Sequence, residues 1–165
     1  SHYELKDLSL CGHSMGGLVA LDMVIKHNYS AKSLILVNSI YPTRVADALL
    51  AKAEIGNGHA ADFIIKYGLY RRLLGLKNAF SDGNEPVMLN DLEACNNYQL
   101  DINELKNLRI SISIILGGKD RLVDLEAVKK FTNVVPSHTY KMDEVGHFSF
   151  FEDPEKLSKL ISELV

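Results

Sequence analysis

The sequence predicts an α/β fold, in which helices flank a mainly parallel β-sheet and a helical insertion separates two of its strands. Short, nearly continuous apolar runs alternate with helix-length stretches along most of the chain. Strands that are apolar on both faces are typical of a parallel sheet covered by helices on both sides. Residues 41–108 interrupt this alternation, because they contain no convincing strand.

The first elements form a strand–helix–strand unit. Residues 8–11 are a short apolar run that ends at glycine, and they predict a buried strand in which Cys11 is a small buried residue. An apolar stretch of helix length follows over residues 18–25 and closes near His27. Residues 33–37, Ser-Leu-Ile-Leu-Val, predict the second buried strand.

The interrupting stretch is expected to be helical. Its helical patterns cover residues 45–55, 60–75 and 86–99. A turn is predicted at residues 81–84, Ser-Asp-Gly-Asn, between the last two helices. A helical insertion between two sheet strands is a candidate lid over the strands' C-terminal ends.

The remaining elements return to the strand–helix pattern. Residues 109–116 predict the third strand and residues 137–142 a fourth, weaker one. Between them, residues 124–131 predict a helix with Asp124 as its N-cap. The last helix is predicted over residues 154–164, where proline suits the first turn. The chain therefore divides into a core sheet with a turn motif at 1–40, a helical lid at 41–108 and a second core region at 109–165.

Composition excludes several classes of function. The 165 residues carry a net charge of -3 with mixed signs throughout, so no nucleic-acid partner is expected. No apolar stretch approaches the ~20 residues of a membrane helix, and no signal peptide is visible at the N-terminus. Two cysteines make no disulfide framework, which favours a reducing, cytoplasmic location.

The motif that carries chemistry is Gly12-His13-Ser14-Met15-Gly16, which matches G-x-S-x-G between the first strand and its helix. A serine at so sharp a turn adopts a strained backbone conformation that exposes its hydroxyl. We expect Gly12 and Gly16 to remove side chains that would collide in the turn. The backbone N–H of Met15, at the helix N-terminus, is the expected oxyanion donor. The motif alone also fits a plain glycine-rich turn.

Two partners for the serine follow later strands. Asp120 comes directly after the third strand and His147 after the fourth, in the order Ser, Asp, His. Taken singly, the aspartate fits a turn residue and the histidine a surface residue. Their joint placement at strand C-terminal ends predicts a catalytic triad of Ser14, Asp120 and His147. No acid directly follows the second strand, where Asn38 and Ser39 stand.

Other residues are candidates for the surrounding pocket. His13 lies inside the motif, and Phe148 and Phe150 flank the predicted base. Apolar lid residues could line a site for an acyl chain, although most are expected to pack internally; these are Ile55, Phe63, Ile64, Ile65, Tyr67, Leu69, Tyr70, Leu73, Leu74 and Met88. No histidine and cysteine cluster has metal-ligand spacing, so neither a metal nor a cofactor is expected.

On these motifs the chain resembles the α/β-hydrolase superfamily. The matching segments are residues 12–17, 34–38, 117–123, 146–148 and 151–155. The Gly-His-Ser-Met-Gly-Gly form and the Gly-His-Phe ending are similar to those of esterases, monoacylglycerol-type lipases and carbon–carbon hydrolases. The resemblance implies a serine hydrolase without a cofactor. Serine at position 14 argues against the epoxide hydrolase and haloalkane dehalogenase branches, which use aspartate there.

The chain departs from this family in the position of its motif. The resemblance implies several strands before the serine turn, yet the turn falls at residue 14. We therefore expect the first strands of the family fold, and the loop that supplies the second oxyanion donor, to be absent from this chain. Three explanations then stay open: the chain is a fragment of a larger polypeptide, which is the leading expectation, it pairs with a separate N-terminal partner piece, or it self-associates through an open strand edge near residues 8–11.

The leading functional hypothesis is hydrolysis of a carboxylic ester or related small acyl substrate through an acyl-enzyme on Ser14. The same triad also allows carbon–carbon cleavage, thioester hydrolysis or acyl transfer. A hypothesis of another class is a ligand-binding or interaction protein on a hydrolase scaffold with little turnover, or an inactive fragment.

Overall fold

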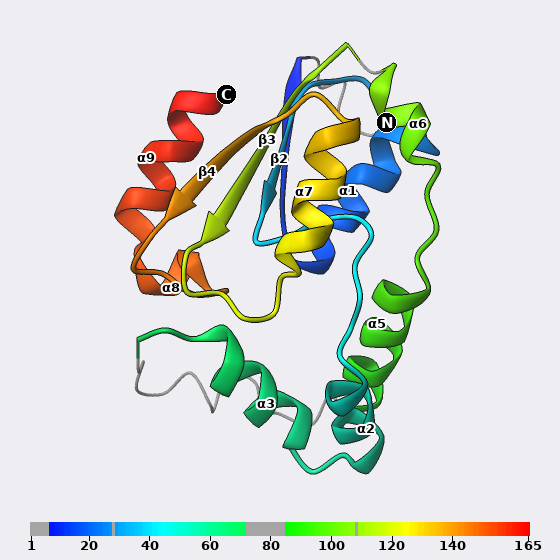
Figure 1. Cartoon of the computed structure of the whole chain (residues 1–165), viewed down its shortest axis with the longest axis vertical. Helices are drawn as coiled ribbons and strands as arrows, with labels where there is room; N and C mark the ends of the chain where they lie inside the picture. Colours follow the sequence, from blue (N-terminus) through cyan, green and yellow to red (C-terminus); the bar gives the residue numbers. More distant parts are fainter. Residues whose placement is uncertain (1–6, 28, 72–84, 108) are drawn as a thin grey trace.

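The computed structural model describes residues 7–27, 29–71, 85–107 and 109–165 (Figure 1). Four parallel strands form one sheet in the order β1-β2-β3-β4. These strands are β1 (Leu8–His13), β2 (Ala31–Val37), β3 (Ser111–Gly117) and β4 (His138–Met142). Because all four run in the same direction, their C-terminal ends lie at one edge, and the predicted parallel sheet is confirmed.

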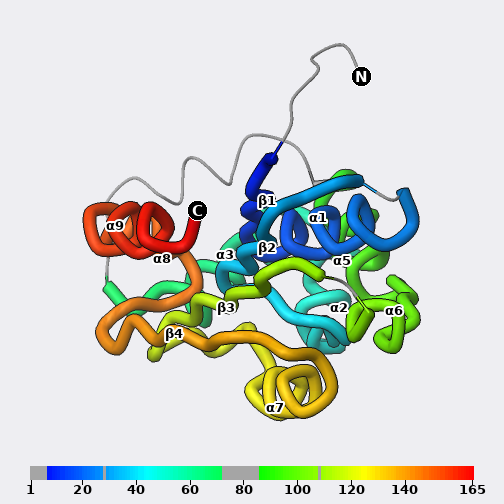
Figure 2. Tube along the Cα trace, turned by 90° about the horizontal axis from the view of Figure 1, so that it is seen from above, coloured from blue at the N-terminus to red at the C-terminus, as the bar shows by residue number. Residues whose placement is uncertain are grey.

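Helices cover both faces of the sheet (Figure 2). The helices α1 (Met15–Ile25) and α7 (Leu125–Val134) pack on one face, and α9 (Pro154–Leu164) packs on the other. Asp124 caps α7 as predicted, because its side chain accepts a hydrogen bond from the N–H of Glu126. The predicted α/β architecture is therefore present in the described part of the chain.

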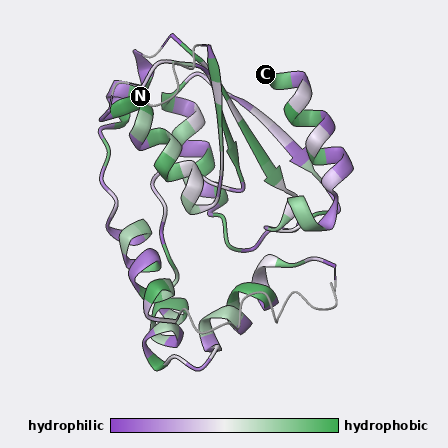
Figure 3. Ribbon diagram, turned by 180° about the vertical axis from the view of Figure 1, so that it is seen from behind, coloured by the Kyte–Doolittle hydropathy of each residue, from purple (hydrophilic) through white to green (hydrophobic). Residues whose placement is uncertain are grey.

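Alternate residues of the inner strands supply two separate apolar clusters. Leu34 and Leu36 of β2 pack with α1 and α7, whereas Ile35 and Val37 pack with α9. All four are at most 2% exposed. In Figure 3 the C-terminal parts of the inner strands are hydrophobic, whereas β4 is more hydrophilic. Only Met142 of β4 is buried, which explains why its sequence pattern is the weakest of the four.

The stretch between β2 and β3 is helical in its described parts. Its helices are α2 (Asp47–Ile55), α3 (His59–Gly68), α5 (Glu85–Asn97) and α6 (Ile102–Lys106). Three of them, α2, α3 and α5, pack around an apolar cluster of their own, and in Figure 1 they lie beyond the arrowheads of the strands. The short α6 was not predicted, and neither was α8 (Ser149–Glu152) after β4. The predicted turn at 81–84 lies outside the described residues.

The helix predicted to begin at residue 60 ends earlier than its pattern suggests. The structure ends α3 at Gly68, and residues 72–75 of the predicted range lie outside the described residues. The carbonyl oxygen of Gly68 accepts a 2.6 Å hydrogen bond from the N–H of His147. The end of α3 therefore coincides with a contact to the distant loop of His147.

Strand β1 forms one edge of the described sheet. It pairs with β2 alone among the described strands, and Cys11 is exposed. The prediction that Cys11 is buried is therefore wrong. Side chains of a strand point to the faces of the sheet, and the described apolar cluster under α9, which contains the paired Ile35, includes no residue of β1. None of the helices in the described ranges combines the length and the apolar character needed to cross a membrane.

Candidate active site

Ser14 is the single residue between the end of β1 and the start of α1. Its backbone has φ 51° and ψ -123°, which few residues other than glycine adopt. Three hydrogen bonds hold this turn. The N–H of Ser14 donates to the carbonyl oxygen of Val37 at 3.0 Å. The carbonyl oxygen of Ser14 accepts from the N–H of Gly17 at 2.9 Å and from the hydroxyl of Ser39 at 2.7 Å.

The glycines of the motif do not all serve the turn in the same way. A Cβ on Gly12 would lie 2.2 Å from the carbonyl oxygen of Gly16, so this position needs glycine. A Cβ on Gly16 would meet no atom of the described residues within 4 Å, and the expected collision there is wrong. The second crowded position is Gly17 instead, where a Cβ would lie 2.3 Å from the hydroxyl oxygen of Ser39.

Met15 is the first residue of α1, so its N–H is one of the amide groups that a helix leaves without an intrahelical partner. The positive end of the helix dipole favours negative charge at this point. Met15 also lines the cavity that contains Ser14. The geometry is compatible with an oxyanion donor.

His147 and Asp120 lie in contact after the ends of neighbouring strands. Nδ1 of His147 is 2.8 Å from Oδ2 of Asp120, and the two side chains are 7% and 2% exposed. The other carboxylate oxygen of Asp120 accepts from the N–H groups of Leu122 and Val123 at 2.7 and 3.3 Å. A carboxylate can only accept, so Nδ1 donates, and in a neutral imidazole Nε2 then keeps its lone pair.

Ser14 shares one cavity with this pair. Ser14 and His147 both line it, although the Ser14 hydroxyl forms no hydrogen bond with any described residue. Catalytic contacts of this kind are often long before substrate binds. The structure thus brings the three predicted triad residues to the same edge of the sheet.

The backbone of His147 is held by two side chains that the sequence analysis did not assign to this task. Its carbonyl oxygen accepts from Nδ2 of Asn38 at 2.6 Å and from Nε2 of His13 at 2.8 Å. Oδ1 of Asn38 also accepts from the N–H of Gly117 at 2.6 Å. The sequence feature that could have identified Asn38 is its position: it is a polar residue directly after a buried strand, at the edge where parallel sheets place their functional sites.

His13 is kept neutral by its surroundings. Burial, reinforced by the nearby His147, lowers the pKa of His13 to about 4. Its ring centroid lies 4.8 Å from the ring of His147 and 4.8 Å from that of Phe150. A neutral imidazole with hydrogen on Nε2 can donate to the His147 carbonyl, as the distance requires.

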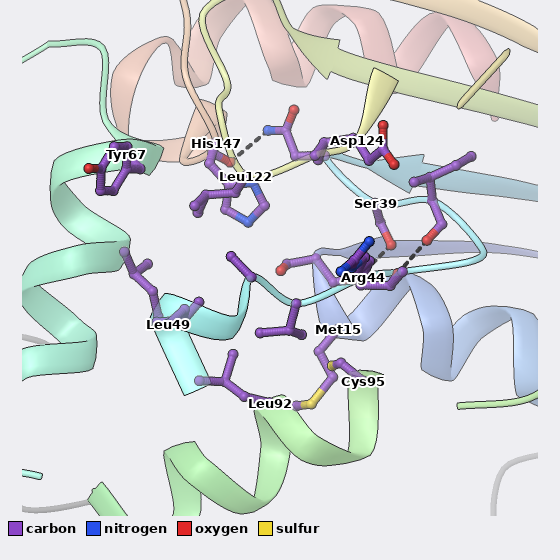
Figure 4. A pocket seen from close by; sticks show the side chains of 18 of the residues that line it. Met15, Ser39, Arg44, Leu49, Tyr67, Leu92, Cys95, Leu122, Asp124 and His147 are labelled. Carbon is purple, nitrogen blue, oxygen red and sulfur yellow. Dashed lines mark hydrogen bonds between the residues drawn. The ribbon is translucent and has the colours of Figure 1, made fainter. Parts of the chain in front are cut away.

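The cavity measures about 1010 Å³ and lies between the sheet edge and the helices of residues 41–108. Its size is at the upper end of ordinary small-molecule sites. Leu49, Tyr67 and Leu92 line this cavity from α2, α3 and α5, and His147 lines it from the sheet edge (Figure 4). The sequence analysis missed Leu49, Leu92 and Cys95. His13, Phe148 and Phe150 also line this cavity.

Only part of the expected apolar lid set reaches the cavity. Phe63, Ile64 and Tyr67 line it. Met88 packs among α2, α3 and α5 instead, while Leu73 and Leu74 lie outside the described residues. In the part of the chain that the structure describes, no group of three or more histidine, cysteine, aspartate or glutamate side chains is arranged to hold a metal ion.

The comparisons with known proteins agree on one family. A sequence model described as the alpha/beta hydrolase family matches residues 3–160. A pimeloyl-[acyl-carrier protein] methyl ester esterase from Aromatoleum aromaticum is 26% identical, over 96% of this chain and 74% of its own length. An uncharacterized hydrolase, YugF, from Bacillus subtilis is 24% identical, over 99% of this chain and 67% of its own length.

Solved structures have the same arrangement of elements. An esterase from Exiguobacterium antarcticum matches with a TM-score of 0.83 at 20% identity, covering 98% of this chain and 68% of that one. The enol-lactonase from Burkholderia xenovorans LB400 matches with a TM-score of 0.75 at 17% identity, covering 93% and 64%. These likenesses show the fold. The match spans about two thirds of the length of each of these structures.

Proposed function

The chain belongs to the alpha/beta hydrolase family, and from this premise we propose that it is a serine hydrolase that cleaves a carboxylic ester or related acyl substrate through an acyl-enzyme on Ser14. The observation that carries the proposal is the buried 2.8 Å contact between His147 and Asp120, in a cavity that Ser14 also lines. The esterase names of one curated relative and of a solved structure support an ester substrate.

In the proposed first half-reaction, the hydroxyl oxygen of Ser14 attacks the acyl carbonyl carbon while Nε2 of His147 takes the hydroxyl proton. Asp120 holds the imidazole in the required tautomer and stabilises its positive charge. The N–H of Met15 donates to the oxyanion. His147 then returns the proton to the leaving alcohol as the carbon–oxygen bond breaks.

In the second half-reaction, water attacks the acyl group on Ser14, and His147 takes a proton from that water. Collapse of the intermediate releases the carboxylic acid and returns the proton to the serine oxygen. The apolar side chains of α2, α3 and α5 that line the cavity, among them Leu49, Phe63 and Leu92, would receive the acyl group.

The decisive experiment is intact-mass spectrometry of the protein before and after treatment with a fluorophosphonate. We expect one adduct on the wild type, none on Ser14→Ala, and an unchanged adduct on Ser158→Ala, which replaces an exposed serine of α9. Hydrolysis of p-nitrophenyl esters of increasing acyl length should show the same dependence on Ser14.

Other outcomes point to the alternatives. An adduct that persists in Ser14→Ala contradicts Ser14 as the nucleophile. A wild type that takes no adduct, yet binds a fatty acid by calorimetry with the same affinity as Ser14→Ala, supports a binding protein on a hydrolase scaffold. Labelling of Ser14 with cleavage of acyl thioesters but not of oxygen esters assigns thioesterase chemistry.

A further inference from the structure

Glu152 is a buried acid that the proposed mechanism does not use. It is the last residue of α8, five positions after His147, and it is only 6% exposed. Glutamate is almost never so deeply buried unless its carboxylate has partners. Its surroundings therefore bear on what it does.

The partners of this carboxylate come from two distant segments. Oε1 accepts a 3.0 Å hydrogen bond from the N–H of Gly146, directly before His147. Oε2 accepts from the N–H groups of Tyr70 and Arg71, each at 3.0 Å. One side chain thus binds three backbone donors, which belong to the loop of His147 and to the segment that follows α3.

These two segments also touch each other directly. The N–H of His147 donates to the carbonyl oxygen of Gly68 at 2.6 Å. A Cβ on Gly146 would lie 2.1 Å from that same oxygen and 2.8 Å from both Oε1 of Glu152 and the nitrogen of Tyr70. The segments are therefore packed without room for one more carbon atom.

The segment of residues 68–71 continues from α3, which supplies Phe63, Ile64 and Tyr67 to the cavity wall. We propose that Glu152 is a positioning residue that joins this wall to the loop of His147, so that the place of the substrate and the place of the base are set together. The proposal rests on the proposed hydrolase function. It assigns Glu152 no contact with substrate.

A carboxylate can accept all three of these backbone hydrogen bonds, one on Oε1 and two on Oε2, whereas an amide cannot. Three N–H donors converge on two oxygens, and both oxygens of a carboxylate accept. In Glu152→Gln one oxygen becomes an NH₂ group. If the remaining oxygen keeps Tyr70 and Arg71, the NH₂ group opposes the N–H of Gly146 and releases the His147 loop. In the opposite orientation the cavity wall is released. Because Gly146 and His147 pack directly on Gly68 and Tyr70, loosening either segment also loosens the other.

The test compares Glu152→Gln and Glu152→Asp with the wild type and with Glu155→Gln, an exposed glutamate in the first turn of α9. For a p-nitrophenyl ester we expect Glu152→Gln to lower kcat about 10- to 100-fold, since misplacement of a catalytic group by about 1 Å costs this much, and to raise KM. Glu152→Asp keeps two acceptors and should recover part of the loss. Glu155→Gln should stay within about twofold of the wild type.

Hydrogen–deuterium exchange supplies a readout that needs no turnover. Glu152→Gln should raise exchange in the peptides that contain Gly146 and Tyr70–Arg71 together, with the strands unchanged. Faster exchange in only one of them, or folded Glu152→Gln with unchanged kcat and KM, overturns the joint. If the wild type shows no ester hydrolysis, the proposed function fails, and paired exchange in both peptides still supports the coupling.

Discussion

The side-chain amide of Asn38 donates a hydrogen bond of 2.6 Å to the carbonyl oxygen of His147, 109 residues further along the chain. The same amide nitrogen lies 3.1 Å from the hydroxyl oxygen of Ser149, and Oδ1 accepts from the N–H of Gly117. A residue at the end of β2 therefore fixes the end of β3 and the loop after β4.

Removing this side chain should destabilise the fold. Asn38 has φ 45°, so Asn38→Gly keeps the backbone conformation while leaving the N–H of Gly117 without its acceptor. We expect a loss of about 1–3 kcal/mol in the free energy of unfolding, measured by urea denaturation. The control is Asp7→Gly, at an exposed residue with φ 55°. Equal losses in the two variants would show that the Asn38 contacts contribute nothing.

Asp120→Asn should remove catalysis while leaving the fold intact. If the amide oxygen keeps the N–H groups of Leu122 and Val123, the NH₂ group faces Nδ1 of His147. Nδ1 must then accept, which places the hydrogen on Nε2 and blocks it as a base. We expect kcat for a p-nitrophenyl ester to fall about 1000- to 10,000-fold. Asp101→Asn, at the exposed N-cap of α6, is the matched control and should keep kcat. A modest loss in Asp120→Asn, similar to the control, would contradict the assigned role.

His13 should make stability depend on pH in mildly acidic solution. Its pKa falls from 6.5 to about 4 on folding, because burial and the neighbouring His147 disfavour its charged form. Between these pH values the unfolded chain binds the proton and the folded chain does not. The free energy of unfolding therefore falls as pH drops from about 6.5 towards 4, by at most about 3 kcal/mol from this residue.

The measurement for His13 is urea unfolding at a series of pH values. His13→Gln keeps an N–H donor but cannot titrate, so its stability should change less steeply across this window than that of the wild type. The control, His138→Gln, removes an exposed ring from β4 and should remain steeper than His13→Gln. Parallel curves for the wild type and His13→Gln would contradict the prediction.

Two glycines of the serine turn should respond in opposite ways to alanine. A Cβ at Gly12 would lie 2.2 Å from the backbone oxygen of Gly16, whereas a Cβ at Gly16 has open space around it among the described residues. Gly12→Ala should lower the free energy of unfolding by about 3 kcal/mol or more. Gly16→Ala, inside α1, should be neutral or stabilising by up to about 1 kcal/mol. Thermal unfolding of both variants checks the contrast, and comparable drops in Tm would contradict it.

The sequence was informative where a local pattern decides the structure. The apolar runs at β2 and β3 predict buried strands because each inner strand meets helices on both faces. The triad residues could be placed because the carboxyl ends of parallel strands share an edge. Because Ser14, Asp120 and His147 each follow a parallel strand, their positions in the sequence predicted that the three residues lie at the same edge of the sheet.

Contacts between distant segments could not be predicted in this way. Glu152 binds the N–H groups of Tyr70 and Arg71, which lie about 80 residues away and carry no local signal. The contact between Gly68, at the end of α3, and the His147 loop likewise carries no local signal. The crowding at Gly17 follows from where Ser39 packs. Each of these features depends on how distant segments pack against one another, which a local sequence pattern does not specify.

The backbone of Ser14 has a positive φ, with φ 51° and ψ -123°. The residue on which the proposed activity depends therefore lowers the thermal stability of the fold. Such a conformation costs of order 1–3 kcal/mol for a residue with a side chain, and glycine adopts it with little strain. Ser14→Gly should therefore unfold at a higher temperature than the wild type although it has lost the hydroxyl. Directed evolution of this protein for thermal survival alone would discard the proposed nucleophile, so any such screen must score turnover in the same round.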